Sequence, residues 1–255
     1  MVCKICSSET ELSFTHKVLK KYDVKYFRCL DCNYLFTENP YWLEEAYKSS
    51  INLSDTGILR RNIYYSKAAA ILIFFYFDYR KKFLDYAGGY GIFTRLMRDI
   101  GFDFYWHDDY TQNLLARGFE MKDNNYELIT AFEVFEHFEN PIIEVKKILN
   151  YSDNILFSTQ TISENIPSLD WWYYGFEHGQ HISFYSKKTF ERMANILGLK
   201  YSSLGELHLL SKEKRIKLNS KLLKLLALSD FYLITKLKLK GKHFTDHLLI
   251  RDQNK

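Results

Sequence analysis

The sequence has little of what makes a chain disordered or fibrous. Only 3 of its 255 residues are proline and 11 are glycine, and the formal net charge is no more than +4. Low hydrophobicity with high net charge would favour disorder, but 47% of the residues are hydrophobic and 17% are aromatic. Such a composition is typical of a globular protein with a large core. A chain of this length accommodates one full domain and a small additional module.

The sequence also lacks a hydrophobic run long enough to cross a membrane. A spanning helix needs about 20 apolar residues, whereas the most apolar run, at residues 68–77, stops at Asp78 and is followed by Arg80, Lys81 and Lys82. Residues 1–21 carry several charged side chains and no apolar core of the kind that a secretory signal has. We therefore expect a cytoplasmic protein.

Cysteine is absent after residue 32, and the four cysteines form two closely spaced pairs, Cys3-x2-Cys6 and Cys29-x2-Cys32. In a reducing compartment this spacing is more typical of a metal site than of disulfides, because a tight turn directs both thiolates of a pair at one ion. A closed set of four thiolates indicates a structural zinc ion and not a catalytic one. Residues 24–28 are expected to form a strand that leads into the second knuckle. A redox pair is the alternative interpretation.

From residue 80 onward, segments typical of strands alternate with segments typical of helices. This alternation predicts an α/β fold with a Rossmann-like, doubly wound and mostly parallel sheet. The strands are expected at residues 82–86, 102–107, 128–132, 154–158, 200–210 and 244–251, and the helices between them at residues 92–100, 111–117, 141–149 and 189–198. Two further helices are expected before residue 80, at residues 39–47 and 63–79. We divide the chain into a zinc-binding knuckle module (1–38), a linker and helical lead-in (39–79) and the main domain (80–255), which carries a C-terminal helical insertion at 212–242.

A loop of small residues follows the first strand of the main domain. Its small residues are Ala87, Gly88, Gly89 and Gly91. Glycine lets the backbone approach a ligand closely at the carboxyl end of a parallel strand. After the next strand, Asp108 can accept hydrogen bonds from both hydroxyls of a ribose. The loop lacks the standard pyrophosphate pattern and a phosphate-binding lysine, which favours a nucleoside without a diphosphate. The alternatives are a structural tight turn and a helix N-cap at Asp108 or Asp109.

These residues resemble the first motif of class I S-adenosylmethionine-dependent methyltransferases, which here takes the form Asp85-x-Ala87-x-Gly89-x-Gly91, with alanine in place of the motif's first glycine. The resemblance extends over residues 60–210. It implies that S-adenosylmethionine is the cofactor, that Asp85 and the loop residues bind it, and that Asp108 binds its ribose. Residues 131–137 resemble the stretch that lines the methionine end of the cofactor, which implies a binding role for Phe132 and Glu133. For Glu136 and His137, a site role and a structural role both remain open.

Residues 171–185 are dense in aromatic and titratable side chains. Such side chains suit the wall of a substrate pocket, and a histidine can take the proton that a hydroxyl loses when it attacks a methyl group. His181 is the first candidate base, His178 the second, and Glu177 is an orienting group. The sequence EHGQHISFYS in this segment resembles sugar methyltransferases, and the related nucleotide-sugar C-methyltransferases also begin with a four-ligand zinc module. Hydrogen-bonded structural histidines are the alternative.

Residues 212–242 stand apart by charge, with ten basic and two acidic side chains. On a helix, Lys217, Lys221 and Lys224 would share one side, and the other side would carry Leu218, Leu222, Leu225 and Leu226. We expect the leucines to pack on the core or on a second subunit. The lysines would face solvent, a phosphate-bearing substrate or an anionic membrane surface.

Together these features predict a methyltransferase of small molecules, with a hydroxyl of a nucleotide sugar or glycan precursor as the acceptor. S-adenosylmethionine and one structural zinc ion are the expected cofactors. An RNA methyltransferase is the first alternative, because zinc modules and basic segments also bind RNA; the zinc region has no basic patch, which makes nucleic acid the weaker prediction. A non-catalytic binding protein on the same fold is the second alternative, for which Ala87 is the only indication.

Overall fold

The chain forms two compact units in the computed structural model, which describes residues 1–48, 52, 55–213, 216–217, 219–229 and 233–253. Each unit is built from several stretches of sequence. The first contains Met1–Asn52, Phe132–Leu149 and Phe157–Arg215, and the second contains Leu53–Ala131, Asn150–Leu156 and Ile216–Lys255. The division of the chain into 1–38, 39–79 and 80–255 stays a prediction.

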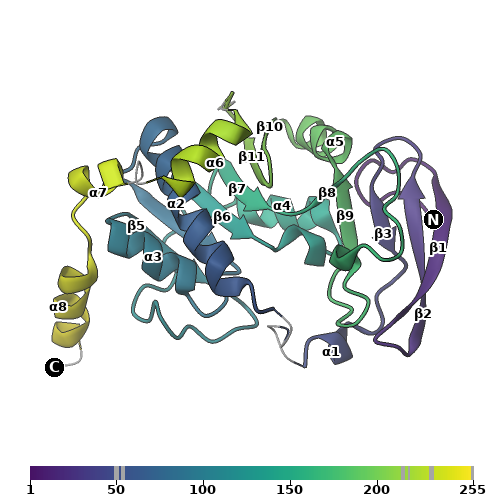
Figure 1. Cartoon of the computed structure of the whole chain (residues 1–255), viewed down its shortest axis with the longest axis horizontal. Coiled ribbons are helices and arrows are strands. Elements are labelled where there is room, and N and C mark those ends of the chain that lie inside the picture. The colour runs from purple at the N-terminus through teal and green to yellow at the C-terminus, as the bar shows by residue number, and fades with distance from the viewer. Residues whose placement is uncertain (49–51, 53–54, 214–215, 218, 230–232, 254–255) are drawn as a thin grey trace. The chain divides into compact units, whose positions relative to one another are not determined.

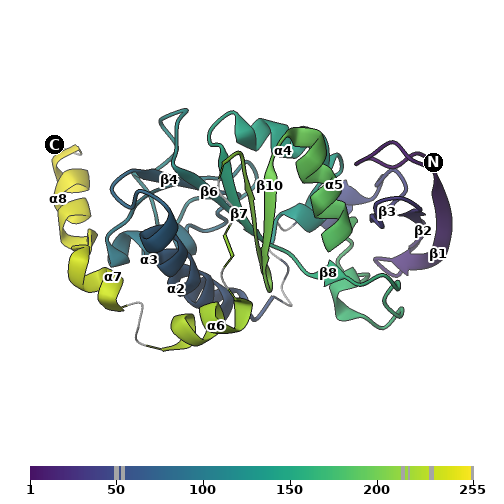
Figure 2. The ribbon, with the colours of Figure 1, turned by 90° about the horizontal axis from the view of Figure 1, so that it is seen from above.

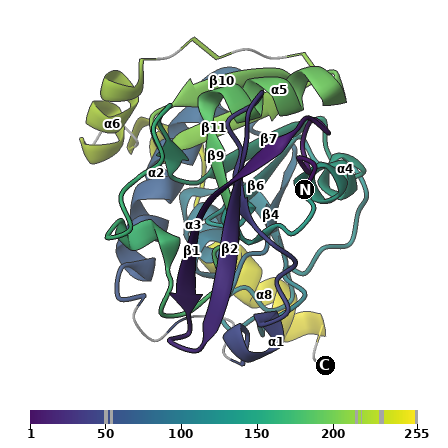
Figure 3. The same cartoon turned by 90° about the vertical axis from the view of Figure 1, so that its right-hand side faces the viewer.

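A five-stranded sheet organises the first unit, with the strand order β1-β2-β3-β9-β8. Its strands are β1 (Thr10–Val18), β2 (Tyr22–Cys29), β3 (Leu35–Thr37), β8 (Thr161–Ile162) and β9 (Ser183–Ser186). Neighbouring strands from β1 to β9 pair antiparallel, and β8 runs parallel to β9. Strands β1 and β2 form the long hairpin in Figure 3. The strand predicted at residues 24–28 is confirmed as part of β2.

Aromatic side chains form much of the core of this unit. Tyr26, Trp42, Tyr173, Tyr174 and Phe184 belong to one buried cluster, each at most 1% exposed. Three short helices accompany this core: α1 (Leu43–Ala46), η1 (Phe135–His137) and η2 (Trp172–Tyr174). Of the helix predicted at residues 39–47 only α1 is helical, and the residues before it form turns.

Two longer helices and a hairpin complete the first unit. They are α4 (Pro141–Leu149), α5 (Lys187–Leu197), β10 (Lys200–Leu204) and β11 (Leu207–Ser211). A capping box starts α5, in which Ser186 and Thr189 each accept from the other's backbone N–H. The single strand predicted at residues 200–210 is wrong. Gly205 adopts φ +86° and allows a tight turn there, so β10 and β11 pair antiparallel.

Parallel strands and their helices build the second unit. Strand β4 (Lys82–Tyr86) pairs parallel with β5 (Asp103–His107) on one side and with β6 (Leu128–Phe132) on the other. Helices α2 (Ile58–Tyr76) and α3 (Ile92–Ile100) contact each other and lie side by side in Figures 1 and 2. The hydrogen-bonded order of six strands, including β7 (Asn154–Ser158), is β10-β11-β7-β6-β4-β5. The predicted α/β fold is confirmed, with mixed sheets.

The C-terminal part of the chain contains the helices α6 (Ser220–Leu228), α7 (Leu233–Lys238) and α8 (His243–Gln253). The final strand predicted at residues 244–251 is therefore wrong, and the 212–242 segment is not an insertion before such a strand. The reason is a tertiary contact. In α8, the carboxylate of Asp246 is buried and forms two hydrogen bonds of 2.8 Å with the guanidinium of Arg98.

The predicted leucine face of the basic segment is also corrected. Helix α6 buries Leu223 and Ala227 and contacts α2, whereas Leu222 and Leu225 are 44% and 65% exposed. Helix α6 is therefore buried along its Leu223 and Ala227 edge and not along the predicted face. Four residues of the prediction lie outside the described ones: Lys214, Arg215, Leu218 and Asp230. No helix in the described part of the chain is both long and apolar enough to span a bilayer.

Residues 111–117 form turns and bends and not the predicted helix. The backbone N–H groups of Tyr110 and Thr111 donate to Asp108 Oδ1, and the N–H of Ala116 donates to Asn113 Oδ1 at 2.9 Å. Side-chain acceptors of this kind compete with the hydrogen bonds of a helix. The polar side chains therefore hold this stretch as a loop.

Candidate functional site

In the second unit, the loop after β4 is shaped for a close backbone approach. The N–H of Gly88 donates to the carbonyl of His107 at 3.0 Å, and the indole N–H of Trp106 donates to the carbonyl of Gly89 at 2.9 Å. A Cβ on Gly88 would lie 2.7 Å from Asp85 Oδ2 and 2.8 Å from the Trp106 ring. Glycine is therefore required at position 88, and the loop is held tightly against strand β5.

Asp85 lies beneath this loop and is buried. Its carboxylate accepts hydrogen bonds from the hydroxyls of Thr94 at 2.9 Å and Thr130 at 3.1 Å. Burial raises the pKa of Asp85 to about 7, although both hydroxyls favour the charged form. Asp85 thus links α3 and β6 at the base of the loop. Its predicted role in cofactor binding would then be to hold the loop in place and not to contact the cofactor directly.

Asp108, directly after β5, organises the same loop. Its Oδ2 accepts the backbone N–H of Gly89 at 2.9 Å, and its Oδ1 accepts those of Tyr110 and Thr111 at 2.8 and 2.7 Å. The carboxylate of Asp108 therefore caps a turn, as the N-cap alternative expects, but no helix follows this turn. A carboxylate has about four acceptor positions, so one position remains after these three hydrogen bonds.

In the first unit, Glu133 has a strained backbone next to Phe132, the last residue of β6. Glu133 adopts φ +56°, a conformation that side chains other than glycine rarely take. Its N–H donates to Ser158 Oγ at 2.9 Å, and its Oε1 accepts the Ser158 hydroxyl at 2.6 Å. Such strain is frequent at functional sites, and the predicted binding role of Glu133 stays a prediction.

The first unit also brings three histidine rings together. The ring of His181 lies 4.8 Å from that of His178 and 5.0 Å from that of His137. His181 Nδ1 lies 2.6 Å from the carbonyl oxygen of Tyr173, whereas His178 Nδ1 accepts the N–H of Gln180 at 3.1 Å. Glu177 is exposed, and no hydrogen bond joins it to either neighbouring histidine among the described residues.

Glu136 and His137 are the residues that the sequence left open, and both lie in this cluster. Glu136 is fully buried, and neither of its carboxylate oxygens has a hydrogen-bond partner in the described part of the chain. Burial, and then the negative charge of Glu133, raise the pKa of Glu136 to about 8, although the nearby hydroxyls of Tyr173 and Thr159 favour the charged form. Burial lowers the pKa of His137 to about 4. The sequence signal was three titratable residues within five positions, directly after a parallel strand.

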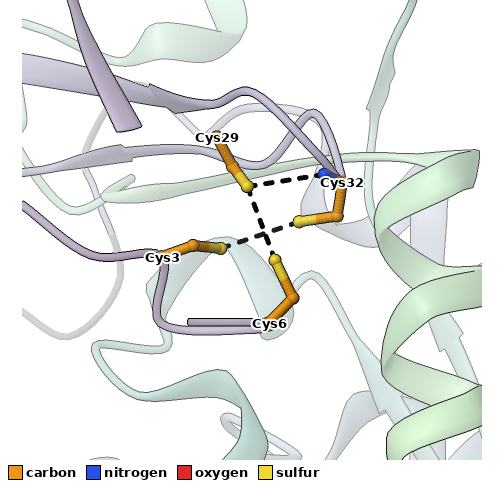
Figure 4. A group of neighbouring side chains, drawn as sticks. All are labelled: Cys3, Cys6, Cys29 and Cys32. Carbon is orange, nitrogen blue, oxygen red and sulfur yellow. Dashed lines mark hydrogen bonds between the residues drawn. The ribbon is translucent and has the colours of Figure 1, made fainter. Parts of the chain in front are cut away.

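The four cysteines form one cluster near the N-terminus, in the first unit (Figure 4). The Sγ atoms of Cys3 and Cys32 are 3.6 Å apart, those of Cys6 and Cys29 are 3.5 Å apart, and all four lie within 4.8 Å of one another. Zinc–thiolate bonds of about 2.3 Å in a tetrahedron place the sulfur atoms about 3.8 Å apart. The donor set and its spacing therefore fit one zinc ion.

The two knuckles share one backbone design. The N–H of the first cysteine donates to the carbonyl five residues later, from Cys3 to Ser8 at 2.9 Å and from Cys29 to Tyr34 at 2.8 Å. The residue after the second cysteine, Ser7 or Asn33, has φ near +60° and donates back to the first. Because two separate segments repeat this geometry, the turns rather than chance packing direct the thiolates at one point.

Comparisons with known proteins agree with this fold. Residues 59–204, more than half of the chain, match the family model described as "Methyltransferase domain". The search of the curated proteins gives no match.

Solved structures of methyltransferases are similar to parts of the chain. CalO1, a methyltransferase in calicheamicin biosynthesis with SAH bound, has 11% identity and a TM-score of 0.44, over 66% of this chain and 58% of that one. An O-methyltransferase family 2 protein from Planctomyces limnophilus in complex with apigenin has 17% identity and a TM-score of 0.40, over 53% and 51% of the chains. The plantazolicin methyltransferase BpumL has 14% identity and a TM-score of 0.44, over 72% and 80%. The chain thus spans less than two thirds of the first two proteins. On the family match, this chain belongs to the methyltransferase-domain family.

Proposed function

We propose that the protein transfers the methyl group of S-adenosylmethionine to a hydroxyl of a small molecule, and that the acceptor is a nucleotide sugar or glycan precursor. The observation that carries the proposal is the glycine loop tied to Asp108, which lies within the residues that match the family. When bound, S-adenosylmethionine supplies an electrophilic methyl group on a sulfonium. Asp108 has one acceptor position left for a ribose hydroxyl, and Gly88 and Gly89 let the backbone lie against the nucleoside.

The acceptor oxygen must lose a proton as its bond to the methyl carbon forms and the bond from that carbon to sulfur breaks. A carbonyl oxygen only accepts, so the contact with Tyr173 requires a proton on His181 Nδ1 and leaves the lone pair on Nε2. The contact between His178 Nδ1 and a backbone N–H requires the opposite tautomer. This difference supports His181 over His178 as the proton acceptor. The dense aromatic surroundings at residues 171–185 support a flat or sugar-like acceptor.

Calorimetry tests the cofactor assignment. S-adenosylmethionine should bind the wild type, and Asp108→Ala should lose about 1.5–3 kcal/mol of binding free energy, since a charged acceptor and the anchor of the loop are removed. Asp109→Ala is the matched control, because Asp109 is an exposed neighbour whose carboxylate lies 3.5 Å from His107 Nε2. Tighter binding of NAD, or no binding by the wild type, would contradict the assignment.

A transfer assay with a panel of nucleotide sugars and with total RNA tests the acceptor. Labelled methyl groups should appear on a sugar and not on RNA. His181→Ala should lower turnover by about 10²–10⁴-fold and leave the cofactor affinity unchanged. Methylated RNA would support the nucleic-acid alternative, and cofactor binding without transfer to any acceptor would support a binding protein.

We also propose that the cysteine cluster holds one structural zinc ion. Purified protein should contain zinc in the cluster, and Cys29→Ser should lose it together with stability of the first unit. The second knuckle is tied to the start of α5, because Thr189 Oγ1 donates to the carbonyl of Cys32 at 2.8 Å. Ser7→Gly is the matched control, since glycine keeps the positive φ of that position. Stoichiometric disulfides without metal would refute the proposal.

A further inference from the structure

The proposed methyl transfer assigns no role to the buried carboxyl group of Glu136. Glu136 is 0% exposed, and both of its carboxylate oxygens lack a hydrogen-bond partner among the described residues. Leaving a buried polar group unsatisfied costs about 1–3 kcal/mol, and each such group in a native structure requires an explanation. Glu136, His137 and His181 each place one potential ligand atom within 4.8 Å of the others. One carboxylate and two imidazoles thus surround a common point.

Both histidines are oriented as metal ligands usually are. His181 Nδ1 lies 2.6 Å from the carbonyl oxygen of Tyr173. His137 Nδ1 lies 3.1 Å from the carbonyl oxygen of Gln180 and 2.9 Å from the hydroxyl oxygen of Tyr47. Since a carbonyl oxygen only accepts, His181 carries its proton on Nδ1 and keeps the lone pair on Nε2, and His137 takes the same tautomer when the Tyr47 hydroxyl accepts. Metal-binding histidines almost always donate their second ring N–H to a carbonyl or carboxylate in this way.

We propose that Glu136, His137 and His181 bind a divalent first-row metal ion. The cation would satisfy the carboxylate oxygens of Glu136, which burial otherwise disfavours in their charged form. Two imidazoles and one carboxylate suit Zn²⁺, Mn²⁺ or Fe²⁺ and leave coordination positions open. This site is separate from the cysteine cluster in its residues and in its donor atoms.

The open positions suggest what the ion does, and this step rests on the proposed function. A hydroxyl bound to a divalent ion has a lowered pKa and a fixed orientation. Coordination would occupy the lone pair of His181 Nε2, so with the ion bound the acceptor hydroxyl would lose its proton to solvent water. Direct proton transfer to His181, as proposed above, would then apply to the site without the ion. With the ion bound, methyl transfer would require all three ligands, Glu136, His137 and His181, and not His181 alone.

Metal titration of the full chain tests the proposal without any methyl-transfer assay. Protein dialysed against a mild chelator, with the cysteine cluster loaded with zinc, is titrated with Mn²⁺ and separately with Zn²⁺, followed by calorimetry and, for Mn²⁺, by electron paramagnetic resonance. One ion should bind per chain in at least one titration. Glu136→Gln should weaken that binding by more than the roughly 10–100-fold that the loss of an outer ligand partner costs, and His181→Ala should do the same.

Glu139→Gln is the matched control, since Glu139 is exposed and only three residues from Glu136. Its metal affinity should equal that of the wild type. Circular dichroism and S-adenosylmethionine calorimetry of each variant check that the fold is retained. The proposal is overturned if neither ion binds beyond the cysteine cluster, or if Glu136→Gln binds as the wild type does. Metal binding without any transfer activity would leave this site established and would refute only the proposed function.

Discussion

At the scale of single residues, Ala87 shows how the loop departs from the methyltransferase motif. Ala87 adopts φ +55°, the left-handed conformation that favours the glycine it replaces. That conformation costs a residue other than glycine about 1–2 kcal/mol, and glycine costs about 0.5–1 kcal/mol in lost chain entropy. Ala87→Gly should therefore raise the free energy of unfolding by up to about 1 kcal/mol in urea titration. Ala87→Val should lower it, because branching at Cβ worsens the clash. A less stable Ala87→Gly variant would refute this account.

Asp85 should make stability depend on pH. Its pKa is raised by burial from the ordinary 3.8 to about 7, so the folded state holds the proton more tightly than the unfolded state does. The free energy of unfolding should then fall as pH rises from about 4 to about 7 and level off above. Asp85→Asn removes this titration, so the loss of stability between pH 5 and pH 8 should be about 2–3 kcal/mol smaller in the variant. Urea titration at both pH values measures it, and equal losses would contradict the assignment.

At the scale of elements, the buried ion pair between Asp246 and Arg98 anchors α8 to α3. The guanidinium of Arg98 also donates to Asp103 at 2.9 Å and lies 3.6 Å from the ring centre of Phe119. Asp246→Ala would leave this cation buried without its main partner, which costs about 3–5 kcal/mol. Asp252→Ala is the control, because the Arg251–Asp252 pair is exposed and should change stability by less than about 1 kcal/mol. Thermal and urea unfolding compare the two, and similar losses would disprove the anchoring role.

At the scale of the whole molecule, the exposed leucines of α6 bear on membrane contact. Leu222, Leu225 and Leu228 are 44%, 65% and 68% exposed, and Lys221 and Lys224 lie among them. We expect the protein to co-sediment with vesicles of anionic lipid and not with neutral vesicles, and salt should weaken the binding.

Two single charge reversals sharpen this vesicle test. Lys224→Glu should reduce the bound fraction, because each basic residue near an anionic surface contributes about 1 kcal/mol. Lys17→Glu, at an exposed position of strand β1, should not change it. Absence of sedimentation at low salt would leave α6 as a packed helix with a solvated face.

The sequence by itself determined the features that depend on neighbouring residues. Two-residue spacing directed Cys3 and Cys6 to one point through a tight turn, and the alternation of strand and helix patterns predicted the parallel strands β4, β5 and β6. The glycine loop was also a local signal, because four small residues within five positions follow directly after a strand. Each of these signals lies in one short stretch, where backbone preferences and periodicity act directly.

Only the tertiary structure decided the features that join distant residues. Asp246 anchors α8 because Arg98 lies opposite it, and Glu136 lies near His181 across 44 intervening positions in the chain. The loop at 111–117 likewise depends on Asp108 and Asn113 acting as acceptors in place of helical carbonyls. The physical reason is the same in each case. A buried charge or carboxyl group is stable only where the fold supplies a partner, and no local pattern of apolar and polar residues specifies which distant residue that partner is.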